Sequence, residues 1–261
     1  MSKFRLTKNN YYSSEANQRY WSASLVKAFL DCPARAVAEL NGEWKQPMGE
    51  ALLIGSYVDS RFEGPKSFAR FKDEHPELYK RDGTLKVAFV KAEEMYQRAK
   101  SDAVFMEYMR GRKQTIKTGT VFGLPFKAKF DAYRKGERIT DLKTVKDMQP
   151  VYLPEMGRVS PVQKWHWDIQ MALYSAIEGN DLPTYLAIVT KENPPDLYLV
   201  EISKAEREAC MAFLEQKMPL FDAMKRGIIE PTRCECCEYC RATKKLTGPI
   251  TMTELEFEKY E

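Results

Sequence analysis

The stretch from Thr115 to Val145 constrains the fold more than any other part of the sequence. It consists of short runs in which apolar and polar residues alternate, separated by Gly119, Gly123 and Gly136. Alternation of this kind between turn-forming residues is typical of antiparallel strands. The stretch therefore predicts three consecutive strands of one sheet.

Apolar residues at helical spacing surround these strands on both sides. We expect helices over residues 22–40 with an interruption at Pro33, and over residues 49–62, 86–109, 163–177 and 204–225. Two more strands are expected over residues 185–190 and 197–202. This order predicts an α/β fold with a mixed, mainly antiparallel central sheet flanked by helices.

The 261 residues suffice for one large domain or two small ones, and no Pro/Gly/Ser-rich linker divides them. We expect a single domain over residues 1–245, with an N-terminal arm and a C-terminal cysteine cluster, followed by a polar tail over residues 246–261. Hydrophobic residues make up 44% and charged residues 30%, which excludes an intrinsically disordered chain. The net charge of +4 permits a polyanionic partner but does not require one.

No apolar run approaches the roughly 20 residues that a membrane-spanning helix needs. The first ten residues also lack the apolar segment of a signal peptide. We therefore expect a cytoplasmic protein that neither enters a membrane nor is secreted.

The hairpin around residues 135–137 brings two acidic residues together in one of its possible registers. If the turn is Lys135-Gly136-Glu137, then Asp131 lies opposite Asp141, with Cβ atoms roughly 5 Å apart. Lys143 then shares their face, because side chains alternate along a strand. A two-residue turn would instead place the two aspartates on opposite faces, and the spacing alone does not decide between the registers.

Two carboxylates held this close repel each other unless a shared proton or a divalent cation neutralises them. Mg²⁺ prefers carboxylate and carbonyl oxygens, and a neighbouring lysine can orient a metal-bound water. The arrangement thus favours metal-assisted hydrolysis of a phosphodiester. The alternative is that Asp131 and Asp141 are solvated surface residues, with Lys129 and Lys143 as counter-charges.

The order Asp131 … Asp141-Leu142-Lys143 resembles the D…(D/E)-x-K signature of the PD-(D/E)XK nuclease superfamily. Two further motifs strengthen the resemblance. One runs from Gly55 to Asp59 on the preceding helix, and the other is the Q-x-x-x-Y pattern that begins at Gln170. The match extends over residues 22–245 and is nearest to the RecE-like (exonuclease VIII-like) phage and prophage exonucleases. It implies a restriction-endonuclease-like fold.

The resemblance also implies roles for individual residues. Catalytic roles fall on Asp131, Asp141, Lys143, Gln170 and Tyr174. Mg²⁺ or Mn²⁺ would be bound by Asp59, Asp131, Asp141 and the backbone carbonyl of Leu142. Asp59 stands where many relatives have histidine. The implied activity is 5′-to-3′ degradation of linear duplex DNA, leaving 3′ single strands for a single-strand annealing protein, by a ring-shaped homo-oligomer.

Candidate DNA-binding residues lie beside these motifs. Phosphates are neutralised by basic side chains and unpaired bases stack on aromatic ones, which selects Lys129, Lys146 and Trp165. Ser24, near a helix start, could bind a phosphate, although an N-cap role is the simpler account. Trp165 could likewise be a core residue. Lys127 and Arg134 are further basic residues on the hairpin.

The cysteines suggest a second metal site. Cys234, Cys237 and Cys240 have ligand-like spacing, and Cys32 could supply a fourth thiolate. Some superfamily relatives hold a [4Fe–4S] cluster with one cysteine before and three after the nuclease core, and Zn²⁺ would suit the same four thiols. Cys236 is extra to this pattern. The alternative is that these are reduced cysteines that pack a C-terminal loop.

Two other functions remain open at this point. The first is an iron–sulfur nuclease of the adaptation type that acts on single strands. The second is a non-catalytic DNA-binding module with a zinc knuckle, against which the intact Asp131, Asp141 and Lys143 argue.

Overall fold

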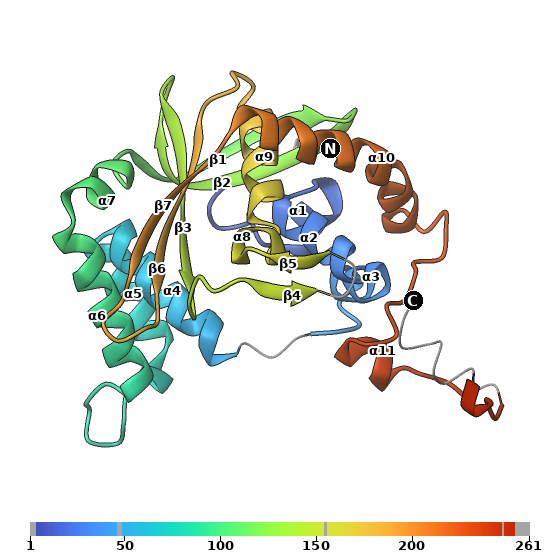
Figure 1. Ribbon diagram of the computed structural model, residues 1–261, viewed down its shortest axis with the longest axis horizontal. Coiled ribbons are helices and arrows are strands. Elements are labelled where there is room, and N and C mark those ends of the chain that lie inside the picture. The colour runs from blue at the N-terminus through green and yellow to red at the C-terminus, as the bar shows by residue number, and fades with distance from the viewer. Residues whose placement is uncertain (1–3, 46–48, 154–155, 247, 254–261) are drawn as a thin grey trace.

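A five-stranded sheet organises the computed structural model, which describes residues 4–45, 49–153, 156–246 and 248–253 (Figure 1). Its strand order is β1-β2-β3-β6-β7, and every neighbouring pair is antiparallel except β3 and β6, which are parallel. The strands are β1 (Arg112–Val121), β2 (Leu124–Arg134), β3 (Arg138–Val145), β6 (Thr184–Thr190) and β7 (Leu197–Ile202). The expected mixed, mainly antiparallel sheet is confirmed.

Helices cover both faces of the sheet (Figure 1). One face carries α4 (Glu50–Glu63), α5 (Pro65–Glu74), the 3₁₀ turn η1 (Pro76–Leu78), α6 (Val87–Ser101) and α7 (Ala103–Tyr108). The other carries α2 (Ala23–Asp31), α3 (Pro33–Asn41), α8 (Pro161–Lys164), α9 (Trp167–Glu178) and α10 (Lys204–Lys225). Each face buries its own hydrophobic cluster, one containing Phe29, Phe130 and Leu173, the other Tyr57, Phe89 and Leu142.

Local sequence signals explain several helix boundaries. The Ser22 hydroxyl accepts a hydrogen bond from the Leu25 amide and caps α2, and Pro33 begins α3 after a break at Cys32. A capping box between Ser203 and Glu206 starts α10. The expected helix starts near Ser22 and at residue 204, and the interruption at Pro33, are thus observed.

The structure differs from the expected elements in three places. The helical region over 86–109 is divided at Asp102, whose carboxylate caps α7. The region over 163–177 is divided because His166 adopts a left-handed conformation, with φ of 51°. Six elements were not expected: α1 (Ser14–Arg19) in the arm, α5 and η1 after α4, α11 (Glu238–Ala242) among the cysteines, and the two-stranded sheet of β4 (Val151–Leu153) and β5 (Gly157–Val159).

Strands β2 and β3 separate soon after their turn. They pair at Arg134–Arg138, Tyr133–Ile139 and Ala132–Thr140, which is the register that a three-residue turn predicts. Beyond Ala132 the strands diverge: β3 remains paired with β6 as far as Val145, while the free edge of β2 is met by the N-terminal arm at Trp21. The sheet is therefore split between β2 and β3.

No helix in the described ranges is long and apolar enough to cross a membrane. Within the expected polar tail over 246–261, residues 247 and 254–261 lie outside the described part of the chain.

Candidate active site

The split between β2 and β3 opens into a cleft of about 1040 Å³. Every residue singled out from the sequence as a catalytic, divalent-cation or DNA ligand contributes to its lining. These residues are Ser24, Asp59, Lys129, Asp131, Asp141, Leu142, Lys143, Lys146, Trp165, Gln170 and Tyr174. Residues separated by more than 140 positions in the sequence thus share one cavity.

The Asp131 carboxylate replaces a backbone hydrogen bond that β2 no longer makes to β3 in the split. The β2–β3 ladder ends at Ala132 and Thr140, one pair before the two aspartates, so they are not paired as ladder residues. Instead the Asp131 carboxylate accepts a hydrogen bond of 2.9 Å from the Leu142 amide. Because that amide no longer has a β2 carbonyl opposite it, the bond both satisfies the amide and orients the carboxylate.

Asp59 reaches the cleft because α4 passes close to β3. A Cβ atom at Gly55 would lie 3.2 Å from the Thr144 Oγ1 atom, closer than most side chains approach. The glycine therefore permits the close passage of α4, and Asp59 follows one helical turn later on the same side. This gives a physical reason for the spacing of Gly55 and Asp59.

Gln170 connects the residues on the other side of the cleft. Its Nε2 atom donates to Asp141 Oδ1 (2.9 Å) and to the Tyr174 hydroxyl (3.1 Å). Its Oε1 atom accepts from Lys27 Nζ (2.8 Å) and Lys143 Nζ (3.3 Å). One amide thus fixes a carboxylate and two ammonium groups.

Burial disfavours the ionised form of two acidic residues in the cleft. It raises the pKa of Asp131 well above the usual value, and the charges of Asp141 and Asp59 raise it further. Burial, followed by the charge of Glu63, raises the pKa of Asp59 to about 7. Burial and the charge of Lys143 lower the pKa of Lys27 to about 8. Additional positive charge at this site is therefore favoured.

The set of donor atoms fits a hard divalent cation. Three carboxylates line the cleft together with Leu142. The buried Asp141 Oδ2 atom forms an ion pair with Lys143. Mg²⁺ and Mn²⁺ bind such oxygens and retain waters that fill the remaining positions.

The four residues expected to bind DNA, Ser24, Lys129, Lys146 and Trp165, all line the cleft. Ser22 is the N-cap of α2, which leaves Ser24 exposed at the cleft. Trp165 is 52% exposed with Lys164 Nζ 5.0 Å from its ring centre, whereas Trp167 is 7% exposed and packs in the core. Trp165 is therefore not a core residue, whereas its neighbour Trp167 is.

Two basic residues expected beside the groove lie elsewhere. Lys127 is buried, where its Nζ donates to Asn17 Oδ1 (2.7 Å) and to the Tyr11 carbonyl. It therefore anchors the N-terminal arm. Arg134 lies at the hairpin tip, in ion pairs with Glu107 (2.6 Å) and Glu137 (2.9 Å). Neither side chain lines the cleft.

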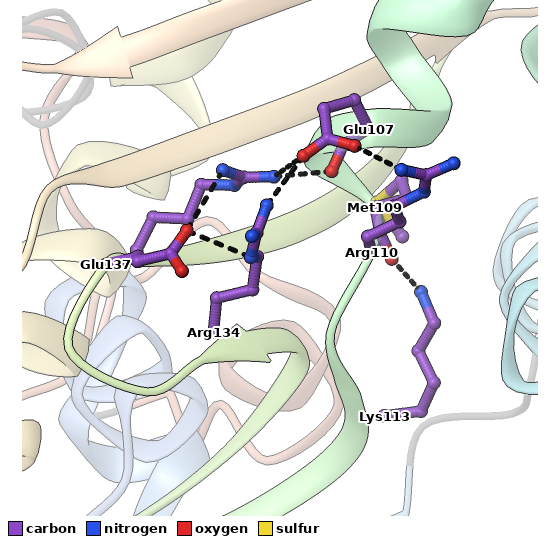
Figure 2. A network of polar contacts seen from close by, with 7 residues as sticks. Glu107, Met109, Arg110, Lys113, Arg134 and Glu137 are labelled. Atoms are coloured by element: carbon purple, nitrogen blue, oxygen red, sulfur yellow. Dashed lines mark hydrogen bonds and ion pairs between the residues drawn. The ribbon is translucent and has the colours of Figure 1, made fainter.

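Figure 2 shows how the hairpin tip accommodates its positive charges. Arg134 and Arg138 are paired across the hairpin, and Glu107 of α7 contacts both, at 2.6 Å and 3.1 Å. Arg110 adds a third contact to Glu107 at 2.8 Å. The tip is a compensated surface network.

Several residues of the cleft were not found from the sequence. Lys27 is one turn beyond Ser24 on α2, a spacing that could have indicated it. Tyr11 and Tyr12 form a wall from the arm, with Lys129 Nζ 4.7 Å from the Tyr12 ring centre. Behind the residues that line the cleft, Gln114 of β1 contacts two of the aspartates. No pattern in the sequence distinguishes it.

The cysteines form a separate cluster beside α3 and α11. The sulfur atoms of Cys32, Cys234, Cys237 and Cys240 all lie within 4.8 Å of one another, close enough to bind one metal ion together. Cys240 Sγ lies 3.6 Å from Cys32 and 3.9 Å from Cys234. Tetrahedral zinc with bonds near 2.3 Å places its sulfurs roughly 3.8 Å apart. Cys236 is exposed and outside the group.

Comparison with known proteins agrees with this architecture. Residues 22–243 match the model of a family described as "PDDEXK-like domain of unknown function (DUF3799)". A crystal structure from Eubacterium rectale, named "Putative exonuclease", is 38% identical, with a TM-score of 0.92 over 97% of this chain and 98% of that chain.

A second solved structure, SSO0001, is 14% identical over 84% of this chain and 96% of that chain, and its TM-score of 0.34 is too low to support an argument. No curated protein matches the chain.

Proposed function

The chain belongs to the DUF3799 family of PDDEXK-like domains, and from this premise we propose that it is a divalent-cation-dependent DNA exonuclease. The observation that carries the proposal is the meeting of Asp59, Asp131, Asp141 and Lys143 in one cleft at the split between β2 and β3. Asp131 and Asp141 are the two acids, and Lys143 the lysine, of the D…(D/E)-x-K signature.

Asp59, Asp131, Asp141 and the Leu142 carbonyl would hold the cation. Bound there, Mg²⁺ or Mn²⁺ supplies the charge that makes a water nucleophilic and neutralises the phosphate in the transition state. Lys143 positions the attacking water, and Gln170 keeps Lys143 and Asp141 in place through the two ends of its amide. Tyr174 remains a neutral phenol, because burial raises its pKa, and donates to the Lys129 carbonyl.

The rest of the cleft suits a DNA strand. Ser24, Lys129 and Lys146 offer hydrogen bonds and positive charge to phosphates, and the exposed ring of Trp165 offers a stacking surface. The name of the Eubacterium rectale protein supports attack at ends rather than internal sites. On the resemblance to RecE-like enzymes, we infer 5′-to-3′ degradation of duplex DNA by a homo-oligomeric ring, as part of recombination with an annealing protein.

The cysteine cluster is proposed as a structural metal site. The measured sulfur separations of 3.6 Å and 3.9 Å suit a single tetrahedral ion such as Zn²⁺. A [4Fe–4S] cluster on the same four thiols would instead favour the adaptation-type nuclease. Elemental analysis of anaerobically purified protein separates the two, because iron with absorbance at about 400 nm indicates the cluster, and zinc without colour indicates the single ion.

The test of activity uses end-labelled linear duplexes with 5′-phosphate or 5′-hydroxyl ends, and a covalently closed circle, each with Mg²⁺. We expect degradation of the linear substrates, stepwise release from the 5′ end, and an intact circle. Cleavage of the circle at the same rate would exclude an exonuclease.

Asp141→Ala and Lys143→Ala test the residue assignment within the same assay. Each variant is expected to bind DNA in a gel-shift experiment but to leave it uncut. Full activity in both would overturn the assignment, and an inactive wild-type protein that binds DNA would indicate the non-catalytic module.

A further inference from the structure

Gln114 occupies an unusual position behind the carboxylates. It lies in β1 between Lys113, which pairs with Ala132, and Thr115, which pairs with Phe130, so it faces Asp131. Its φ of 50° is left-handed, a conformation that non-glycine residues seldom adopt and that sequences seldom place inside a strand. The side chain is 4% exposed. Such strain in a buried polar residue calls for a functional explanation.

The Gln114 amide touches two of the three aspartates of the cleft. Its Nε2 atom lies 3.2 Å from Asp131 Oδ1 and 3.5 Å from each oxygen of Asp59. These carboxylates belong to β2 and α4, on different elements. The amide is therefore a bridge that sets the distance between them.

The chemistry of an amide matters at this position. A lysine or arginine would also bond to the carboxylates, but its charge would neutralise them as a bound cation does. An apolar side chain would leave the carboxylates without this donor. A glutamine contacts both carboxylates and leaves their negative charge in place. Its own Oε1 atom is buried and has no donor among the described residues.

We propose that Gln114 is a positioning residue that holds Asp59 and Asp131 at the separation in which they bind one divalent cation together. This inference rests on the proposed function of the same cleft. Gln114 itself does not contact the cation or the substrate; it acts through the two carboxylates.

Mn²⁺ titration of the full-length protein without DNA, followed by the electron paramagnetic resonance of free Mn²⁺, tests this directly. Gln114→Met removes the donor at nearly constant length, and we expect its Mn²⁺ affinity to fall at least tenfold. The loss of nuclease activity should be recovered in large part at high Mn²⁺ concentration. The matched control is Gln97→Met, which removes another amide that donates to a carboxylate, Glu93 at 2.7 Å, away from the cleft. Its Mn²⁺ affinity should equal that of the wild type.

Gln114→Lys tests the role of the neutral amide, because lysine offers a donor but adds a charge that opposes the cation. We expect this variant to have a raised melting temperature and at least tenfold weaker Mn²⁺ binding. If Gln114 instead only stabilises the fold, Gln114→Met lowers the melting temperature and leaves the Mn²⁺ affinity of the folded protein at the wild-type value. Wild-type affinity in Gln114→Met would overturn the inference. Failure of the wild type itself to bind Mn²⁺ would instead overturn the proposed function.

Discussion

Like charges lie close together at both ends of the β2–β3 hairpin, but the groups that contact these charges differ between the two ends. At the tip, Arg134 and Arg138 face each other, and Glu107 forms ion pairs with both (Figure 2). At the split end, the hydrogen bonds to Asp131 among the described residues come from neutral groups, the Leu142 amide and Gln114. Both arginines of the tip are thus compensated by ion pairs, whereas Asp131 has no ion pair among the described residues.

The pKa shifts follow the same division. Hydrogen bonding to Arg138 and the charges of Arg110 and Arg134 lower the pKa of Glu107, so its ionised form stabilises the fold. Burial and neighbouring acids raise the pKa of Asp131, so its ionised form destabilises the fold. The ionised form is thus stabilised at the tip and disfavoured at Asp131, as is common for carboxylates at functional sites.

Replacing one carboxylate by an amide at each end of the hairpin should have the largest and most different effects. Asp131→Asn should lower nuclease activity by about 10³-fold or more, the scale of losing a group that stabilises transition-state charge. Without divalent cations it should also raise the free energy of unfolding at pH 7, because it removes a disfavoured charge. Glu107→Gln is the matched control, with wild-type activity expected. Comparable activity in the two variants would show that the ends of the hairpin do not differ in function.

Divalent cations should stabilise one end of the hairpin and leave the other unaffected. At a concentration 100 times the dissociation constant, Mg²⁺ should add about 2.7 kcal/mol to the free energy of unfolding. The gain should vanish in Asp131→Asn and persist in Glu107→Gln, as measured by urea denaturation with and without EDTA. An equal gain in all three proteins would place the cation elsewhere.

The raised pKa of Asp59 determines how the stability of the protein should change with pH. Its pKa is raised from 3.8 to about 7, so between these values the folded protein binds more protons than the unfolded chain. Stability in EDTA should therefore fall as pH rises from about 4 to 7, by roughly 1 kcal/mol per pH unit contributed by this group. Asp59→Asn should flatten that slope. An unchanged slope in the variant would assign the effect to another group.

The close passage of α4 at β3 predicts a change confined to the cleft. Gly55→Ala places a methyl group 3.2 Å from Thr144 Oγ1 and should displace Asp59, lowering activity by about tenfold. The melting temperature should change little, because alanine favours the helix by about 1 kcal/mol and offsets the contact. Gly49→Ala, at a position with no atom within 4 Å, is the control and should retain full activity.

The smallest effect is expected for Glu107, at the tip of the hairpin. Since the pKa of Glu107 is lowered, its contribution to stability is present above pH 4.5 and disappears as the pH falls through its folded value. Glu107→Gln should therefore lower the melting temperature slightly at pH 7 and not at low pH, measured by calorimetry. Because this network is solvent-exposed, added salt should reduce the difference.

Much of the site could be predicted because its signals are local. Gly136, with φ of 75°, sets the three-residue turn and hence the register that brings Asp131 toward Asp141. The split itself could not be predicted, because it depends on Trp21 meeting β2 from more than 100 residues away. Gln114 escaped notice for the same reason, since its partners come from α4 and β2 and its backbone conformation contradicts the strand pattern.

The contacts of the arm give the molecule a late step in its assembly. The Trp21 indole donates to Asp222 (3.1 Å), and Lys225 donates to the Tyr20 carbonyl (3.2 Å), both on α10. A ribosome translates β2 about 100 residues after the arm and α10 about 200 residues after it, so the arm meets Phe126 and Lys127 before it meets α10. The last contacts of the arm therefore form only on a nearly finished polypeptide, and a prematurely terminated fragment would lack them.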